Sequence, residues 1–334
     1  MGIKLLRLAA TLLSPGTTAS TSTASAADAH SDVLRATPHH PSTAPPSAHH
    51  LDALLAFGRG SRLSAAALAS ALTDRLRAAS SSGHGGDAAV ALKCLVALRI
   101  LLARGAFILR DQLLVALVRH PASGRNPLAL ASFPLARSFA AASWVRFSAR
   151  LLEVLLLLPP DASRDADYLT ALPNPHLVSE LSAFASVTAA VRQAPPPSCA
   201  PQANALIWEA VRLAEEDRVT AERNIAARVR EMGERLDTLD LADAMELVCV
   251  LRRVEESAAS PPEWKWAGLD EAVVADAARL RERAEEVLLR RTEQDRRLLR
   301  RDSAASASAR GVARGADDVR FRSSRWGGAV SSWR

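Results

Sequence analysis

Apolar side chains recur every three or four residues along most of the chain, which is the spacing of one face of an α-helix. One run begins at His49 and continues through Leu51, Leu54 and Leu55. Another follows Asp87 as "AAVALKCLVALRILLARG" and is apolar nearly all round, which predicts a buried central helix. Further helices are expected at residues 28–37, 61–79, 106–119, 141–158, 176–193, 203–236, 241–257 and 268–300. The pattern predicts an all-α solenoid or bundle.

Capping residues mark the ends of several of these runs. Ser47 and Asp87 stand just before two of them, and both residue types are common N-caps because their side chains accept hydrogen bonds from the first free amides. Gly105 follows the central run and is expected to end it. "LDTLD" at 236–240 superficially resembles a clathrin-box peptide, but its position between two helical runs favours a helix junction.

Composition supports a folded helical protein with an anionic partner. Hydrophobic residues make up 49% of the chain and aromatic residues only 4%, which leaves few strand formers. The net charge of +6 comes almost wholly from arginine and favours phospholipid or nucleic acid. Cys94, Cys199 and Cys249 show no metal-ligand spacing, so neither a disulfide framework nor a zinc site is predicted.

The N-terminal segment has two interpretations. "MGIKLLRLAATLL" is a short amphipathic stretch suited to inserting into a membrane surface, and the residues best placed for this are Lys4, Leu5, Leu6 and Arg7. The same basic start, free of acidic residues, also suits a cleaved targeting peptide. Residues 14–27 are Ser, Thr and Ala rich, which predicts a flexible linker.

Two further features concern the rest of the chain. Residues 301–334 are rich in Arg, Ser and Gly, which predicts a disordered basic tail. The longest apolar runs fall well short of the roughly 20 residues that a membrane-spanning helix needs.

No sequence motif indicates an enzyme. A nucleophile elbow, a phosphate loop and a dinucleotide fingerprint are all absent, so neither a catalytic site nor a cofactor is expected. His39, His40, His49 and His50 form two adjacent pairs without the i, i+4 spacing of helical metal ligands, so no metal site is predicted. They are either solvated residues or ligands of an anion.

Three segments of distinct composition occur in a characteristic order: "SDVLRATPHHPSTAPPSAHHLDALL", "GDAAVALKCLVALRILLARGAFILRDQL" and "SWVRFSARLLEVLL". This order resembles the ANTH domain of the clathrin assembly proteins, most closely the short plant members. The resemblance covers residues 28–300, with residues 1–27 and 301–334 as flanking segments. It implies an ANTH/ENTH-like right-handed superhelix of helices.

The resemblance also implies a binding site for the headgroup of phosphatidylinositol 4,5-bisphosphate. In that family the ligands are basic residues near the end of one early helix and in a Pro-Lys-x-Lys-His stretch. Here Arg35 matches the first position, Pro46 the proline and His50 the histidine, whereas Ser47 and His49 occupy the two lysine positions. A lysine near an anionic membrane contributes about 1 kcal/mol, so their replacement weakens the expected binding by about 2 kcal/mol.

The sequence therefore predicts a non-enzymatic, phosphoinositide-binding adaptor in clathrin-associated vesicle formation and endocytosis. By resemblance, its partners include clathrin coat components and a vesicle SNARE. The expected location is the cytoplasmic face of the plasma membrane, clathrin-coated pits and vesicles, and the Golgi. Two alternatives are a helical interaction scaffold without lipid selectivity and an organellar helical protein with a cleaved transit peptide. Nucleic acid is not an expected partner.

Overall fold

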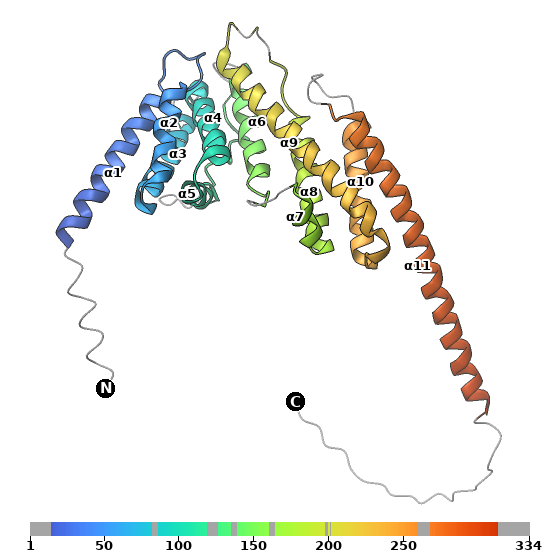
Figure 1. Ribbon diagram of the computed structural model, residues 1–334. Helices are drawn as coiled ribbons and strands as arrows, with labels where there is room; N and C mark the ends of the chain where they lie inside the picture. Colours follow the sequence, from blue (N-terminus) through green and yellow to red (C-terminus); the bar gives the residue numbers. More distant parts are fainter. Residues whose placement is uncertain are drawn as a thin grey trace, which may run out of the picture. The chain divides into compact units, whose positions relative to one another are not determined.

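The computed structural model describes residues 15–81, 86–118, 126–134, 139–159, 164–197, 200, 202–259 and 268–312. All of the regular structure in these ranges is helical, so the all-α prediction is confirmed (Figure 1). The helices are α1 Pro15–Ala36, α2 Ala48–Ala56, η1 Phe57–Arg59, α3 Arg62–Ser81, α4 Ala88–Arg104, α5 Phe107–Val118, α6 Phe139–Leu155, α7 Ala166–Ala171, α8 Asn174–Val191, α9 Ala205–Arg235, η2 Leu236–Thr238, α10 Leu241–Ala259 and α11 Glu271–Val312.

The chain divides into two units, Met1–Ala284 and Glu285–Arg334. Helix α11 contributes residues to both. In the second unit, Glu286 pairs with Arg290 at 3.9 Å, one helical turn further along the chain. Such i, i+4 pairs stabilise a solvated helix by a few tenths of a kcal/mol each.

The predicted helix caps are confirmed. The Ser47 hydroxyl accepts a hydrogen bond from the backbone N–H of His50 at 3.3 Å. The Asp87 carboxylate accepts one from the N–H of Val90 at 3.0 Å. At the other end of α4, the N–H of Gly105 donates to the carbonyl of Leu101 at 2.8 Å. The "LDTLD" stretch forms η2 at the junction between α9 and α10, as expected for a structural segment.

Two helices are longer than the sequence predicts. Helix α1 begins at Pro15, where the composition indicates a flexible linker at 14–27. Proline suits the first position of a helix, and alanine, frequent in this stretch, is the strongest helix former. Helix α11 likewise continues to Val312, past the predicted end at residue 300, through a stretch in which alanine, a strong helix former, is frequent. The domain boundaries at residues 27 and 300 stay predictions.

Helix α4 forms the centre of the first unit, as its apolar pattern predicts. Every residue from Val90 to Leu101 is buried except Arg99, which is partly exposed. Neighbouring helices α2, α3, α5, α6 and α9 all contact it. Helices distant in sequence therefore share one core.

A buried ion pair connects α4 to α9 across that core. Arg99 Nε donates to Asp217 Oδ2 at 2.8 Å, and only 3% of the Asp217 side chain is exposed. Burial alone would lower the pKa of Arg99, but its hydrogen bonds to Asp217 raise it above the ordinary value. The guanidinium therefore stays charged, and the pair fixes α9 against α4.

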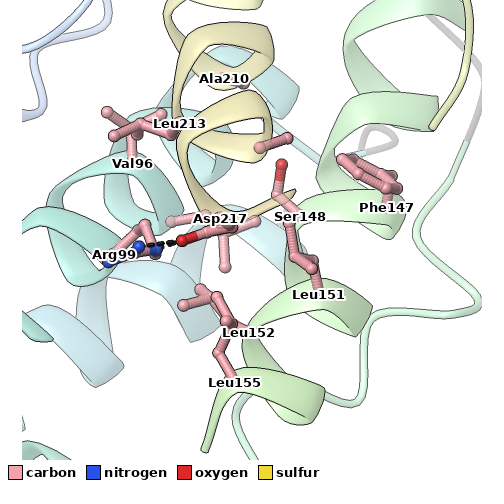
Figure 2. Close-up of a pocket in the computed structure, with 12 residues that line it drawn as sticks. Val96, Arg99, Phe147, Ser148, Leu151, Leu152, Leu155, Ala210, Leu213 and Asp217 are labelled. Carbon is pink, nitrogen blue, oxygen red and sulfur yellow. Dashed lines mark hydrogen bonds and ion pairs between the residues drawn. The ribbon is translucent and has the colours of Figure 1, made fainter. Parts of the chain in front are cut away.

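Apolar side chains surround this pair. Figure 2 shows Arg99 and Asp217 meeting beside Leu151, Leu152 and Leu155 of α6. The hollow between these helices has a volume of about 20 Å³. That volume holds about one water molecule, so this part of the core offers no room for a ligand.

A second buried pair connects α8 to α9. Arg228 Nε donates to Glu180 Oε2 at 2.9 Å, and the Arg228 guanidinium lies 4.7 Å from the centre of the Phe184 ring. Neither charged side chain is more than 7% exposed. Paired charges thus join α9 to helices on two sides.

We expect Arg99→Leu to lower the free energy of unfolding by about 3 kcal/mol or more, because Asp217 is left buried without its cation. Replacing both partners by leucine should recover much of that loss, since no unpaired charge remains. Urea unfolding followed by circular dichroism measures both variants. Equal losses in the single and double variants would show that packing, rather than the unpaired carboxylate, sets the cost.

Candidate functional site

The residues of the predicted headgroup site lie around the connection between α1 and α2. Arg35 is in the last turn of α1, residues 37–47 form the connection, and His49 and His50 are in the first turn of α2. The structure thus brings the predicted residues to one region. Lys4, Leu5, Leu6 and Arg7, predicted to insert into a membrane, lie outside the described residues.

Arg35 points its charge along its own helix. The guanidinium contacts Asp32 Oδ1 at 3.0 Å and donates to the Ser31 hydroxyl at 3.0 Å. Its side chain is 63% exposed. Exposed pairs of this kind contribute about 0–1 kcal/mol, so an incoming phosphate can compete with Asp32 for the guanidinium.

Ser47 and His50 form one local unit. Besides accepting from the His50 backbone, the Ser47 oxygen lies 2.9 Å from His50 Nδ1. The Ser47 hydroxyl therefore contacts both the backbone N–H and one ring nitrogen of His50 at the start of α2. Ser47 occupies one of the family's lysine positions but acts here as a cap.

His49 and His40 face solvent. The His49 ring is exposed, and its only ring neighbour among the described residues is His50, with centroids 5.6 Å apart. His40 is also exposed. Both imidazoles belong to the same stretch of chain as Arg35, His40 in the α1–α2 connection and His49 in the first turn of α2.

The α1–α2 connection is held in place by a lysine that the sequence analysis did not single out. Lys93 Nζ, from α4, donates to the carbonyls of Pro38 at 2.7 Å and Pro41 at 2.8 Å. The residue is 1% exposed. Burial lowers the pKa of the Lys93 ammonium, which the charge of nearby Asp87 partly opposes. The available sequence signal was a single lysine in the middle of a helix that is apolar nearly all round.

His39 links this connection to α3 and α4. Its Nδ1 lies 2.6 Å from Asp87 Oδ2, and its Nε2 lies 3.3 Å from Arg75 Nη2. Arg75 also donates to the Thr37 carbonyl at 3.0 Å. His39 is therefore a structural residue, whereas His40 and His49 remain available to a ligand.

Asp87 stays ionised despite its position beside this network. Burial by itself would raise the pKa of the carboxyl group, but hydrogen bonds from the Val90 backbone and from His39 outweigh it and hold the pKa below the ordinary value.

Within the described residues, no group of three or more His, Cys, Asp or Glu side chains could hold a metal ion.

A comparison with curated proteins finds a relative in Arabidopsis thaliana named "Putative clathrin assembly protein". The two chains are 34% identical over 243 residues, which cover 68% of this chain and 63% of the relative. This chain belongs to the ANTH-type clathrin assembly proteins. The resemblance found in the sequence is thereby confirmed, although the chain spans less than two thirds of the length of this relative. No protein-family model matches the chain.

None of the helices in the described ranges is both long enough and apolar enough to cross a bilayer.

Replacing Lys93 by methionine is expected to loosen the α1–α2 connection. The carbonyls of Pro38 and Pro41 lose their common donor, and leaving buried polar groups unsatisfied costs about 1–3 kcal/mol. Amide hydrogen exchange read by mass spectrometry should become faster in residues 37–47 and stay unchanged in α8 and α9. Arg77→Met, on the exposed face of α3, is the control. Unchanged exchange in the connection would show that other contacts hold it.

Asp87→Asn should lower stability more at neutral pH than in acid. Because the folded pKa of Asp87 lies below its ordinary value, the carboxylate stabilises the protein above about pH 4, and this contribution is lost as pH falls through the folded pKa. The difference in unfolding free energy between wild type and variant should therefore shrink from pH 6 to pH 3. Asp276→Asn, in an exposed pair with Arg279, should give a small difference throughout. A constant Asp87 difference would refute the linkage.

Proposed function

We propose that this chain is a peripheral membrane adaptor that binds phosphoinositide headgroups through the end of α1 and the start of α2. Its activity belongs to clathrin-associated vesicle formation and endocytosis. The observation that carries the proposal is the exposed Arg35 guanidinium, supported by the chain's membership of the clathrin assembly family. Arg35 presents planar donors suited to a bidentate phosphate contact.

The surroundings of Arg35 add charge and order to the proposed site. His40 and His49 are exposed nearby in sequence, and His50 lies at the helix start with one ring nitrogen against Ser47. The connection between the two helices is fixed by Lys93 and Arg75, so a ligand need not order it. A preordered site loses less conformational entropy on binding.

The proposed partners follow from the same role. They are a bilayer containing phosphatidylinositol 4,5-bisphosphate, clathrin coat components and a vesicle SNARE, and the chain is proposed to have no enzymatic activity and no nucleic-acid ligand. The proposed locations are the cytoplasmic side of the plasma membrane, coated pits and vesicles, and the Golgi. Insertion of Lys4, Leu5, Leu6 and Arg7 would add unselective membrane affinity.

A second candidate is a helical scaffold that has lost lipid selectivity. Two observations favour it: Arg35 is already paired with Asp32, and Ser47, at a lysine position of the family motif, serves as a helix cap. In that case anionic lipids would bind by net charge alone, without preference for a bisphosphate.

Vesicle co-sedimentation distinguishes these candidates. Vesicles with and without phosphatidylinositol 4,5-bisphosphate, at matched total negative charge, are compared for the wild type and for Arg35→Ala/His49→Ala/His50→Ala. We expect the wild type to prefer the bisphosphate vesicles and the triple variant to bind them about tenfold or more weakly, at about 1 kcal/mol per lost cation.

A matched control carries Arg279→Ala/His176→Ala. Arg279 is an exposed arginine with the same i−3 pairing to an aspartate, and His176 is an exposed histidine on α8. This control should keep the wild-type preference. Equal binding of wild type and triple variant to both vesicle types would support the scaffold instead.

A further inference from the structure

Helix α5 carries a row of exposed apolar side chains. Phe107 is 77% exposed, Val115 59% and Val118 69%, and their spacing places them on one helix face. Ile108 is also 39% exposed. No other helix in the described ranges exposes as many large apolar residues. Such grouped exposure usually marks a binding surface.

An open hollow adjoins the N-terminal end of this row. It has a volume of about 520 Å³ and is lined by Asp52 and Leu55 of α2, Arg59 of η1, Arg104 of α4, and Ala106. Beside Arg59, η1 packs closely on α5: a Cβ atom added at Gly58 would lie 2.8 Å from the Cβ of Leu109. Ala106, which lines the hollow, directly precedes Phe107, the first residue of the apolar row, so the hollow and the row are neighbours.

Arginines outnumber aspartates at this surface by three to two. Arg59 is exposed and makes no ion pair with any residue that the structure describes. Arg104 is 63% exposed and lies 3.9 Å from Asp52, which is a loose contact. Arg62 is 75% exposed and faces Asp111 at 3.5 Å. The surface therefore offers apolar contact area beside arginines whose guanidinium groups can donate hydrogen bonds to carboxylates.

The position of the surface helps to choose between a membrane and a protein as its occupant. His39, in the α1–α2 connection, contacts Asp87 at the start of α4, whereas Arg104 lies in the last turn of α4. Seventeen helical residues separate these ends by about 25 Å. Figure 1 shows α5 at the end of α4 opposite to the α1–α2 connection. A bilayer held at that connection, as proposed above, would leave α5 free.

We propose that the α5 face and the Arg59 hollow together form a docking surface for a peptide segment of a partner protein, in which acidic residues stand beside apolar ones. The apolar side chains of the segment pack on Phe107 and Val115. Its carboxylates pair with Arg59 and Arg104. The concave Arg59 hollow suits a narrow peptide better than a flat bilayer.

The probe is a phage-displayed library of random 12-residue peptides, selected on the full chain. We expect enrichment of peptides that combine Asp or Glu with Leu or Phe. Fluorescence anisotropy with a selected peptide should then show at least tenfold weaker binding to Phe107→Ser/Val115→Ser and, independently, to Arg59→Glu. The two variants alter exposed residues, and circular dichroism confirms that each is folded.

Matched controls are Phe139→Ser, which removes another exposed phenylalanine, and Arg279→Glu, which reverses another exposed arginine. Both should bind the peptide like the wild type. The proposal is overturned if no acidic and apolar sequence is enriched, or if the α5 variants bind the peptide unchanged.

Two other results would also overturn it by naming a different occupant. Loss of vesicle co-sedimentation in the α5 variants would make this face a membrane contact. A dimer of the wild type that the α5 variants dissociate, in sedimentation velocity, would make it a self-association surface. Unchanged vesicle binding together with lost peptide binding separates this proposal from the proposed headgroup site, so either can fail alone.

Discussion

The buried ammonium of Lys93 is the interaction on which the α1–α2 region depends. The Lys93 side chain projects from the central helix α4 and donates to two carbonyls of the connection, at Pro38 and Pro41. A buried cation loses its hydrogen bonds to water, and here two carbonyl oxygens replace those bonds. Since those oxygens belong to the connection, the same contacts that satisfy Lys93 also fix where α1 ends and α2 begins.

Two other cations in the core of the first unit also have partners. Arg99 is hydrogen-bonded to Asp217. Arg228 is hydrogen-bonded to Glu180 and lies over the Phe184 ring. Paired buried charges add little net stability compared with apolar residues of the same shape. We infer that their role here is to favour one arrangement of the helices that carry them. In an alanine- and leucine-rich protein, where many helix faces look alike, such pairs distinguish the correct neighbour from a wrong one.

The sequence predicts local features well and distant partners poorly. Ser47, Asp87 and Gly105 act through groups three or four residues away, so their roles follow from their positions. Arg99 and Asp217 are separated by 118 residues, and periodicity identifies a helix face without identifying what covers it. The candidate site shows the same division. Arg35, His49 and His50 lie at the two ends of the α1–α2 connection, and their role in binding stays a prediction. The contacts of Lys93, Arg75 and Asp87 that hold this connection are known only from the three-dimensional structure.

Most residues at the candidate site have contacts that stabilise the fold rather than side chains that are free to bind a ligand. Of the residues matched to the family's basic motif, Ser47 caps α2, His50 contacts that cap, and Arg35 is paired along its own helix. What the fold contributes is a connection that Lys93 and Arg75 hold in place. In the proposed headgroup site, selectivity for a bisphosphate would depend on whether Arg35 exchanges Asp32 for a phosphate. If the proposed headgroup site is used, its affinity therefore rests on one exchange of ion-pair partners at an exposed arginine, from Asp32 to a phosphate.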